Sequence, residues 1–562
     1  MMFGRSRLDI QSMANVQKLR GIPFAGSSLR RCWPMPDATA RGILSPGGNS
    51  LRRMCLDFAV TLAVVFLLMS SALTAEKAEL GDVHFPISCK AEVQSGFDYG
   101  LALLHSFEFR EAEEAFRAVE SDDPQCVIAA WGIALATTER SGANAPQKDL
   151  AKGWAQLQPW LSIPAGTERE QMYVDAVRAM YEGYDKTSGD DRWHKYLNRM
   201  QEIRQKYPDD INASLFYGLG LTWTAGPGKR GIQQRREALA IFLPIFKQYP
   251  NNPGAAHYII HAADTAELAA EALPAARKYA AIAPDSPHAL HMPSHIFNRL
   301  GYWKDSIETN QASVRVAAEW AKTGRDGRFD ELHALNNIEY AYLQLGQDKQ
   351  AQQIIKQIEE VAKAGSDRWL PIDARIYYDL ETHNWQDAAK IEPPPASRFE
   401  ENFDAYWIET IGAARSGNAH KAEQALELYR KSSAAWDEEH GWGHVLGVAL
   451  TEAQAWTMFS EGKRDEAVAH LRNIAQYERD HPLYYADVLP RPTGEMLGDM
   501  LLQMAKPAEA LEAYKQALEL APNRFDSLIG AKTAAARSGN MELSQAYANK
   551  IRAEGGLLAP RG

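Results

Sequence analysis

The 562-residue sequence lacks the short motifs that most often identify an enzyme. It contains no Walker loop for phosphate binding, no GxSxG nucleophile elbow and no HExxH zinc motif. It also lacks the apolar–polar alternation of β-strands over any useful length. These absences leave nucleotide chemistry, serine hydrolysis and a β-sheet fold without support.

Long hydrophobic runs are scarce as well. The longest, Phe58 to Met69, is too short to span a bilayer comfortably. It follows Arg52 and Arg53 and leads into small residues, an order typical of a secretory signal peptide. We therefore expect residues 51–75 to be a signal peptide, cleaved after Ala72 or Ala75, with no stable membrane span afterwards.

About fifty residues precede this signal, rich in Gly, Pro, Ser and Arg and without helical periodicity. We expect residues 1–50 to be a disordered leader, or the true translation start to lie nearer the signal. Export would place the mature protein, residues 76–562, in a bacterial-type periplasm or outside the cell.

Cysteine is rare, with four in the whole chain. Cys32 and Cys55 would leave with the leader, so that Cys89 and Cys126 remain. In an oxidising compartment two remaining thiols are best interpreted as one disulfide.

Positive charge is lacking outside the N-terminal segment. Beyond residue 75, acidic side chains outnumber basic ones by 69 to 52. Such a surface does not favour nucleic acid or an anionic membrane as a partner.

A repeat of small and aromatic residues with a period of 34 runs along the rest of the chain. Three clear copies hold the order of Gly or Ala, an aromatic residue and a final Pro: Gly100, Ala112, Phe116 and Pro124; Ala272, Ala276, Tyr279 and Pro284; Leu497, Gly498, Leu501, Ala510, Tyr514, Ala517 and Pro522. Small residues allow two helices to approach closely, aromatic rings fill the gaps, and the proline ends the second helix. Further turns are expected at Gly301, Gly346, Asn384, Gly417, Gly462 and Gly539.

With this period and these packing residues, the mature chain resembles the tetratricopeptide repeat family over nearly its whole length. The resemblance implies an all-α, right-handed solenoid of about a dozen helical hairpins. It also implies a concave groove that binds a peptide, a protein or a small molecule. Fold alone does not give function.

Histidines recur with the same period. His257 and His261 lie four residues apart, and His291 and His295 repeat that spacing 34 residues later. Residues four apart share one helix face, and packed helices run about 8–10 Å apart. We therefore expect these four imidazoles to converge.

Further polar residues are expected on the same helix faces as these four histidines. His288 precedes His291 by one turn, and His333 is its equivalent in the next repeat. Asp264 and Asn298, again 34 apart, extend the stripe as expected neighbours of the ligands. Each histidine of the two pairs follows a packing residue by one position, a flank that the resemblance places in the concave groove.

Six histidines on three consecutive helices predict a site for one or two transition-metal ions. Imidazoles without thiolates favour copper or zinc, with iron as a further candidate. The protein would then be a metal-dependent oxidoreductase or hydrolase, if it is an enzyme at all. The alternative is a non-catalytic scaffold of the cell envelope, whose histidines contact a peptide or partner protein.

Other candidates carry weaker signals. His440 and His444 flank two glycines that favour a loop, and His105 is expected to be a satisfied interior or groove residue. Four tryptophans either line the groove or pack within hairpins: Trp131, Trp407, Trp442 and Trp456. A further cluster is expected to be polar groove surface or a capping contact: Tyr484, Tyr485, Arg491 and Glu495.

Overall fold

A computed structural model describes residues 78–137, 145–325, 327–363, 368–395, 397–440, 443–481 and 492–556. The chain divides into two units, Met1–Lys77 and Ala78–Gly562, and every described residue belongs to the second. The following predictions lie outside the described residues: the leader (1–50), the signal peptide (51–75), Trp442, Tyr484, Tyr485, Arg491 and the side chains of His440 and His444.

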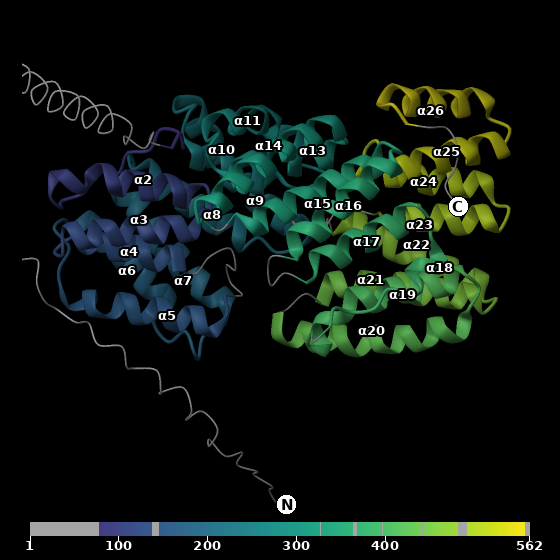
Figure 1. Cartoon of the computed structure of the whole chain (residues 1–562), viewed down its shortest axis with the longest axis horizontal. Helices are drawn as coiled ribbons and strands as arrows, with labels where there is room; N and C mark the ends of the chain where they lie inside the picture. The colour runs from purple at the N-terminus through teal and green to yellow at the C-terminus, as the bar shows by residue number, and fades with distance from the viewer. Residues whose placement is uncertain are drawn as a thin grey trace, which may run out of the picture. The chain divides into compact units, whose positions relative to one another are not determined.

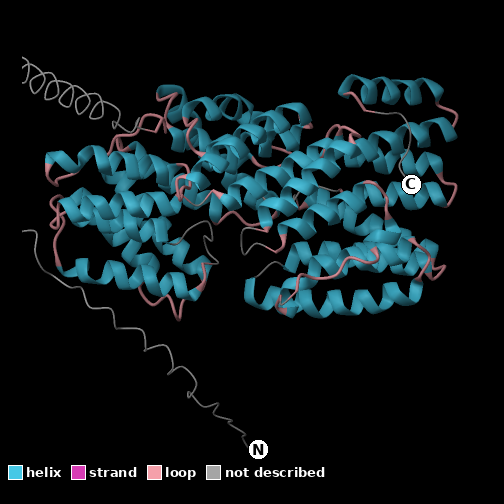
Figure 2. Ribbon diagram, viewed as in Figure 1, coloured by secondary structure: helices cyan, strands magenta, loops and turns pink. Residues whose placement is uncertain are grey.

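The described part of the chain is all-helical, as predicted. Within the described residues, consecutive helices pair into twelve helical hairpins. Each helix packs on the next one along the chain (Figures 1 and 2). No strand is present among the described residues. The predicted all-α solenoid is therefore confirmed. None of the described helices has both the length and the apolar character needed to cross a bilayer.

The first hairpins run from residue 94 to residue 282. Their helices are α2 (Gln94–His105), α3 (Phe109–Asp122), α4 (Val127–Thr137), α5 (Gln147–Leu157), α6 (Glu168–Tyr181), α7 (Gly189–Lys206), α8 (Ile211–Trp223), α9 (Gly228–Gln248), α10 (Pro253–Ala263) and α11 (Ala269–Ile282). Short 3-10 turns at Ala91–Val93 and Gln158–Ser162 precede α2 and follow α5.

The remaining hairpins continue to residue 554. Their helices are α12 (Pro287–His291), α13 (Pro293–Leu300), α14 (Trp303–Lys322), α15 (Arg328–Gln344), α16 (Asp348–Ala362), α17 (Leu370–Glu381), α18 (Trp385–Ala388), α19 (Phe403–Arg415), α20 (Ala419–His440), α21 (Gly443–Ser460), α22 (Arg464–Asp480), α23 (Thr493–Gln503), α24 (Pro507–Leu520), α25 (Phe525–Arg537) and α26 (Met541–Glu554). A 3-10 turn, Phe399–Asn402, precedes α19.

The small residues of the repeat sit where helices cross. A Cβ added to Gly100 would lie 3.0 Å from the ring of Phe116, and one added to Gly498 would lie 2.6 Å from the ring of Tyr514. The ring in the second helix of a hairpin thus packs directly on the backbone of the first. This is the close approach for which the repeat pattern requires glycine.

Five of the six predicted turns contain a glycine in the left-handed region. Gly301, for example, has φ 70° and Gly346 has φ 65°. At the sixth turn, Asn384 itself has φ −78°, and the preceding His383 takes the left-handed conformation at φ 59°. The turn is present there, one residue earlier than its sequence signature suggests.

The predicted disulfide is present between Cys89 and Cys126, which are 37 residues apart. It ties the segment before α2 to the start of α4. Nearby, Lys90 N donates a hydrogen bond to Asp123 Oδ2 at 2.9 Å. The segment before the first hairpin is therefore tied to the segment after it by both a disulfide and a hydrogen bond.

Helices far apart in the sequence also pack together. A fully buried Arg524 before α25 donates to Glu381 of α17, to Glu495 of α23 and, at 2.6 Å, to the Tyr340 hydroxyl of α15. Glu495, a candidate for the groove surface or a capping contact, is instead buried in this ion cluster. The last repeats are thereby fastened onto the middle ones.

We expect Arg524→Met to lower the free energy of unfolding by about 3–5 kcal/mol, because it leaves two buried carboxylates without their cation. Urea unfolding followed by circular dichroism measures this change. Arg236→Met is the matched control, since Arg236 pairs with Glu267 and Glu271 on the surface; it should cost less than about 1 kcal/mol. Equal losses would contradict the role of Arg524 as a buried fastening.

Candidate metal centre

Three consecutive first helices of hairpins supply the histidines. His257 and His261 are in α10, His288 and His291 in α12, His295 in α13 and His333 in α15. Side-chain caps from Asn252 and Ser286 start α10 and α12. Pro293 then divides the second of these first helices into α12 and α13, since proline has no N–H to continue the ladder.

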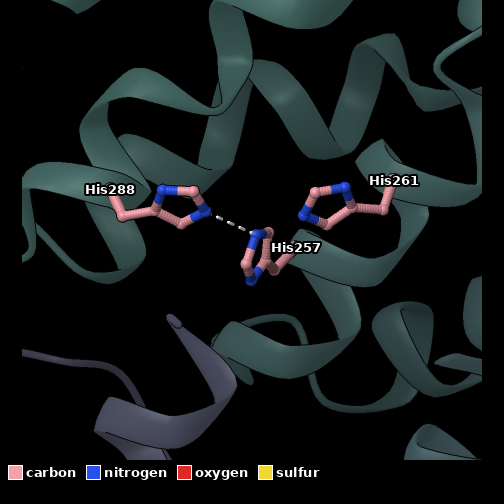
Figure 3. Close-up of side chains that lie close together, drawn as sticks. All are labelled: His257, His261 and His288. Atoms are coloured by element: carbon pink, nitrogen blue, oxygen red, sulfur yellow. Dashed lines mark hydrogen bonds between the residues drawn. The ribbon is translucent and has the colours of Figure 1, made fainter. Parts of the chain in front are cut away.

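The first histidine triad consists of His257, His261 and His288. One ring nitrogen from each lies within 4.8 Å of the others. The Nε2 atoms of His257 and His288 are 3.2 Å apart. Figure 3 shows the His261 ring approaching the same point from the opposite side, so that three nitrogens face one space.

The second histidine triad consists of His291, His295 and His333, again with one nitrogen from each within 4.8 Å. The Nε2 atoms of His291 and His295 are 2.9 Å apart. The His291 and His333 rings lie edge to face, with centroids 4.5 Å apart. The two triads are neighbours, because the centroids of His288 and His291 are 6.2 Å apart.

All six predicted histidines are thus brought together, but in a different grouping from the expected one. The two pairs that share the 34-residue period do not converge on one point. Each pair instead joins a single histidine from the next first helix: His288 joins the α10 pair, and His333 joins the pair of α12 and α13. The same arrangement of three histidines therefore occurs twice.

The resemblance places these side chains in the concave groove, but the structure shields most of them from solvent. Five of the histidines are buried and His333 is half-buried. The reason is that the turn between α2 and α3 covers the first triad: Phe107 lies 4.4 Å from His257, 5.2 Å from His261 and 5.7 Å from His288, centroid to centroid. At the second triad, Phe329 stacks on His333.

Hydrogen bonds determine which nitrogens of the second triad carry protons. His295 Nδ1 lies 3.1 Å from Asp264 Oδ2, and His291 Nδ1 lies 2.6 Å from Asn310 Oδ1. The Asn310 amide is oriented by its own Nδ2, which donates to the Ser306 carbonyl. Both partners of the rings are therefore acceptors, so both Nδ1 atoms are donors. In neutral imidazoles the two facing Nε2 atoms then present lone pairs to each other.

The first triad has one nitrogen assigned in the same way. His257 Nδ1 donates to the His105 carbonyl oxygen at 2.6 Å, which leaves a lone pair on Nε2. On the far side of His288, Nδ1 lies 4.0 Å from Asp330 Oδ1, and the His288 backbone N–H donates to Glu108. Burial, followed by the charge of Asp330, raises the pKa of Glu108 to about 8. Two acidic residues therefore lie beside His288 at one edge of this triad.

Asp264 lies next to His295, one of the candidate ligands. Burial would raise its pKa, but the charge of Arg299 and hydrogen bonds from His295 and Arg299 outweigh burial and lower the pKa from 3.8 to about 2. Asn298 is less direct: it donates to Asn337, which in turn donates to the His333 carbonyl. Asp264 is thus bonded to a ring of the site, whereas Asn298 supports the helix that carries His333.

Several residues of this centre could not be predicted from the histidine pattern. Phe107, Glu108 and Asn310 come from other elements and carry no spacing signal relative to the histidines, whereas Asp330 lies in α15, three residues before His333. Phe107 has φ 57°, an uncommon conformation for a residue with a side chain. Only the fold reveals that the α2–α3 turn returns to α10.

The weaker candidates prove structural. His105 is fully buried and bonded to Tyr258 and Asn212, so it is a satisfied interior histidine, as expected. Trp131 and Trp456 are buried in hairpin cores, and Trp407 is partly buried against the same core as Trp456. None of these residues lies in either triad.

No protein-family model matches the chain, and no curated protein sequence matches it. Among solved structures, the human IFIT1 dimer with m7Gppp-AAAA is 12% identical with a TM-score of 0.34, covering 76% of this chain and 90% of that chain. Yeast Tom70 is 10% identical with a TM-score of 0.32, covering 82% and 99%. The TPR domain of P58(IPK) is 14% identical with a TM-score of 0.21, covering 80% and 99%. Likenesses this distant carry no information about ligand or activity.

The class of this protein is therefore described from the features of its own structure. It is a solenoid of helical hairpins in which two three-histidine clusters lie side by side, enclosed by the turn between α2 and α3 and by α15.

We expect Asp264→Asn to weaken metal binding at the second triad by about 10–100-fold. The reason is that a neutral amide is a weaker hydrogen-bond acceptor for His295 Nδ1 than the charged carboxylate. Binding at the first triad should be unchanged. Competition with a chromophoric chelator measures both affinities. Asp305→Asn is the control, since Asp305 pairs only with Arg277 at the surface among the contacts described. A loss shared equally by both triads would contradict this assignment.

Proposed function

We propose that this protein binds two transition-metal ions, one in each histidine triad. The observation that carries the proposal is the pair of facing Nε2 atoms of His291 and His295, 2.9 Å apart, whose Nδ1 atoms are both committed to acceptors. Two lone pairs at this distance repel each other. A bound cation turns that repulsion into attraction.

The separations also suit coordination. With metal–nitrogen distances of about 2.0–2.1 Å, two ligands of one ion lie about 2.9–3.4 Å apart for bond angles between 90° and tetrahedral. The Nε2 pairs are 2.9 and 3.2 Å apart. Hydrogen bonds from the opposite ring nitrogens to oxygen atoms are the supports that metal-binding histidines commonly have.

The donor set points to the class of metal and of chemistry. Three neutral imidazoles without a thiolate favour copper or zinc, and iron is also compatible. Three protein ligands leave a coordination position open, which is the arrangement of catalytic rather than structural zinc sites. Zinc would supply an activated water, whereas copper would supply redox chemistry. We infer a metal-dependent hydrolase or oxidoreductase accordingly.

The first test is metal content. Full-length protein, purified without an affinity tag and loaded with Cu²⁺ or Zn²⁺, should contain two ions per chain by mass spectrometry. His257→Ala with His261→Ala should retain one ion, and His291→Ala with His295→Ala should also retain one. His333→Ala, at the half-buried position, weakens the second site without opening a core cavity.

The control replaces histidines outside the site. His194→Ala with His420→Ala removes two exposed imidazoles and should leave two ions bound. If wild type and all variants contain the same substoichiometric metal after loading, the metal proposal is wrong. The chain is then better described by the alternative of a non-catalytic scaffold for peptides or partner proteins.

We further propose that the protein works in the periplasm or outside the cell. The Cys89–Cys126 disulfide supports this location, since such bonds persist in oxidising compartments. N-terminal sequencing of the protein from the periplasmic fraction should find a chain that begins after Ala72 or Ala75. An uncleaved chain recovered from the cytoplasm with both thiols reduced would contradict the proposal.

A further inference from the structure

The two triads differ in how closely other side chains enclose them. At the first triad, the Phe107 ring contacts all three imidazoles. Trp223 lies 5.2 Å from His261, centroid to centroid. Tyr279 stacks on His257 with centroids 5.2 Å apart. All three histidines of this triad are buried, so an ion bound there would lie inside the protein behind aromatic rings.

The second triad lies where α15 passes from the surface into the interior. Residues 321–325, shortly before this helix, are exposed, and residues 334–341 within it are buried. His333 stands between these two stretches and is half-buried. Phe329, one turn earlier, stacks on the His333 ring with centroids 5.7 Å apart and is itself 45% exposed. This edge of the second triad therefore faces solvent.

The charges beside the second triad favour an anionic ligand. The Asp264 carboxylate is paired with Arg299 at 2.8 Å, so its charge is largely offset. Neutral imidazoles bring no charge of their own, which leaves the charge of a divalent ion uncompensated by its three ligands. A small anion at the open coordination position would supply the missing negative charge.

We propose that the two ions differ in their access to external ligands. The ion of the second triad binds a small anion, such as azide or hydroxide, at its open position beside His333 and Phe329. The ion of the first triad is enclosed by aromatic side chains and binds no such ligand. This division rests on the proposed function, and it makes the second triad the place where a substrate or an activated water binds.

Azide is the probe, because its binding to Cu²⁺ produces a charge-transfer absorption band. Full-length protein loaded with two Cu²⁺ ions should bind one azide ion per chain. The variant with His257→Ala and His261→Ala keeps the second triad and should retain the band and the azide affinity. The variant with His291→Ala and His295→Ala keeps the first triad. It should bind azide about tenfold more weakly or worse, because a hydrated anion must lose its water to enter a buried site.

Removing the aromatic cover should open the first triad. Phe107→Ala deletes the ring that contacts all three imidazoles, so this variant with both ions bound should take up two azide ions per chain. Phe403→Ala is the matched control, since Phe403 is also buried but packs against Trp436. It should leave the ratio at one azide ion per chain. Metal content and circular dichroism, measured on each sample, show that it is loaded and folded.

Three results would overturn the inference while leaving the proposed function standing, because copper is bound in each. They are two azide ions per wild-type chain, equal azide affinity in the two triad variants, and no azide binding to any copper-loaded form. If a variant fails to fold or load, the wild-type ratio decides the question alone. Wild-type protein that takes up no metal contradicts the proposed function and this inference together, so the two failures are distinguishable.

Discussion

The facing imidazoles of His291 and His295 impose the constraint around which this part of the protein is built. His291 Nδ1 is hydrogen-bonded to Asn310, and His295 Nδ1 is hydrogen-bonded to Asp264. Neither ring can therefore rotate its Nε2 away from the other ring without breaking that hydrogen bond. Asp264 is itself held by Arg299, and its depressed pKa keeps it ionised at neutral pH. When both rings are neutral, the polar network therefore holds two lone pairs in opposition, and a cation between them, a metal ion or a proton, makes the arrangement stable.

The solenoid explains why this arrangement occurs twice. Each hairpin places its first helix beside the first helix of the next, so a side chain on one first helix meets a residue about one turn earlier in the register of the next. An HxxxH pair and one histidine from the following helix form a triad, and the next repeat forms another. The turn between α2 and α3 then packs over the first triad, with Phe107 against all three rings. The histidines thus come from successive repeats, and a turn from a distant repeat covers the first triad.

Much of this was predictable from local pattern. The spacing of Gly100 and Phe116, and of Gly498 and Tyr514, predicted the hairpin packing, because close helix crossings need glycine opposite a ring. The 34-residue recurrence of the HxxxH pairs predicted four of the histidines, and the one-turn spacing and the alignment of the hairpin turns added His288 and His333. The cysteine count predicted the disulfide. In each case the physical cause acts within one hairpin or between adjacent ones.

The remainder depends on contacts between segments far apart in the sequence. The division into two triads follows from the contact of His288 with His257, from the packing of α13 on α10 and from that of α15 on α12, which the period alone does not specify. The burial of the histidines depends on a turn about 150 residues earlier, as the His257–His105 hydrogen bond illustrates. Arg524 similarly joins α15, α17 and α23 through partners up to 184 residues away. Such contacts leave no periodic signal in the sequence.

Anomalous X-ray diffraction from crystals of the metal-loaded protein, collected above and below the absorption edge of the metal, tests the central claim most directly. The account predicts two separate anomalous peaks, one among His257, His261 and His288 and one among His291, His295 and His333. Each peak should lie about 2.0–2.1 Å from three ring nitrogens. Ordered crystals that show these histidines clearly, with no anomalous peak in either triad, would contradict it.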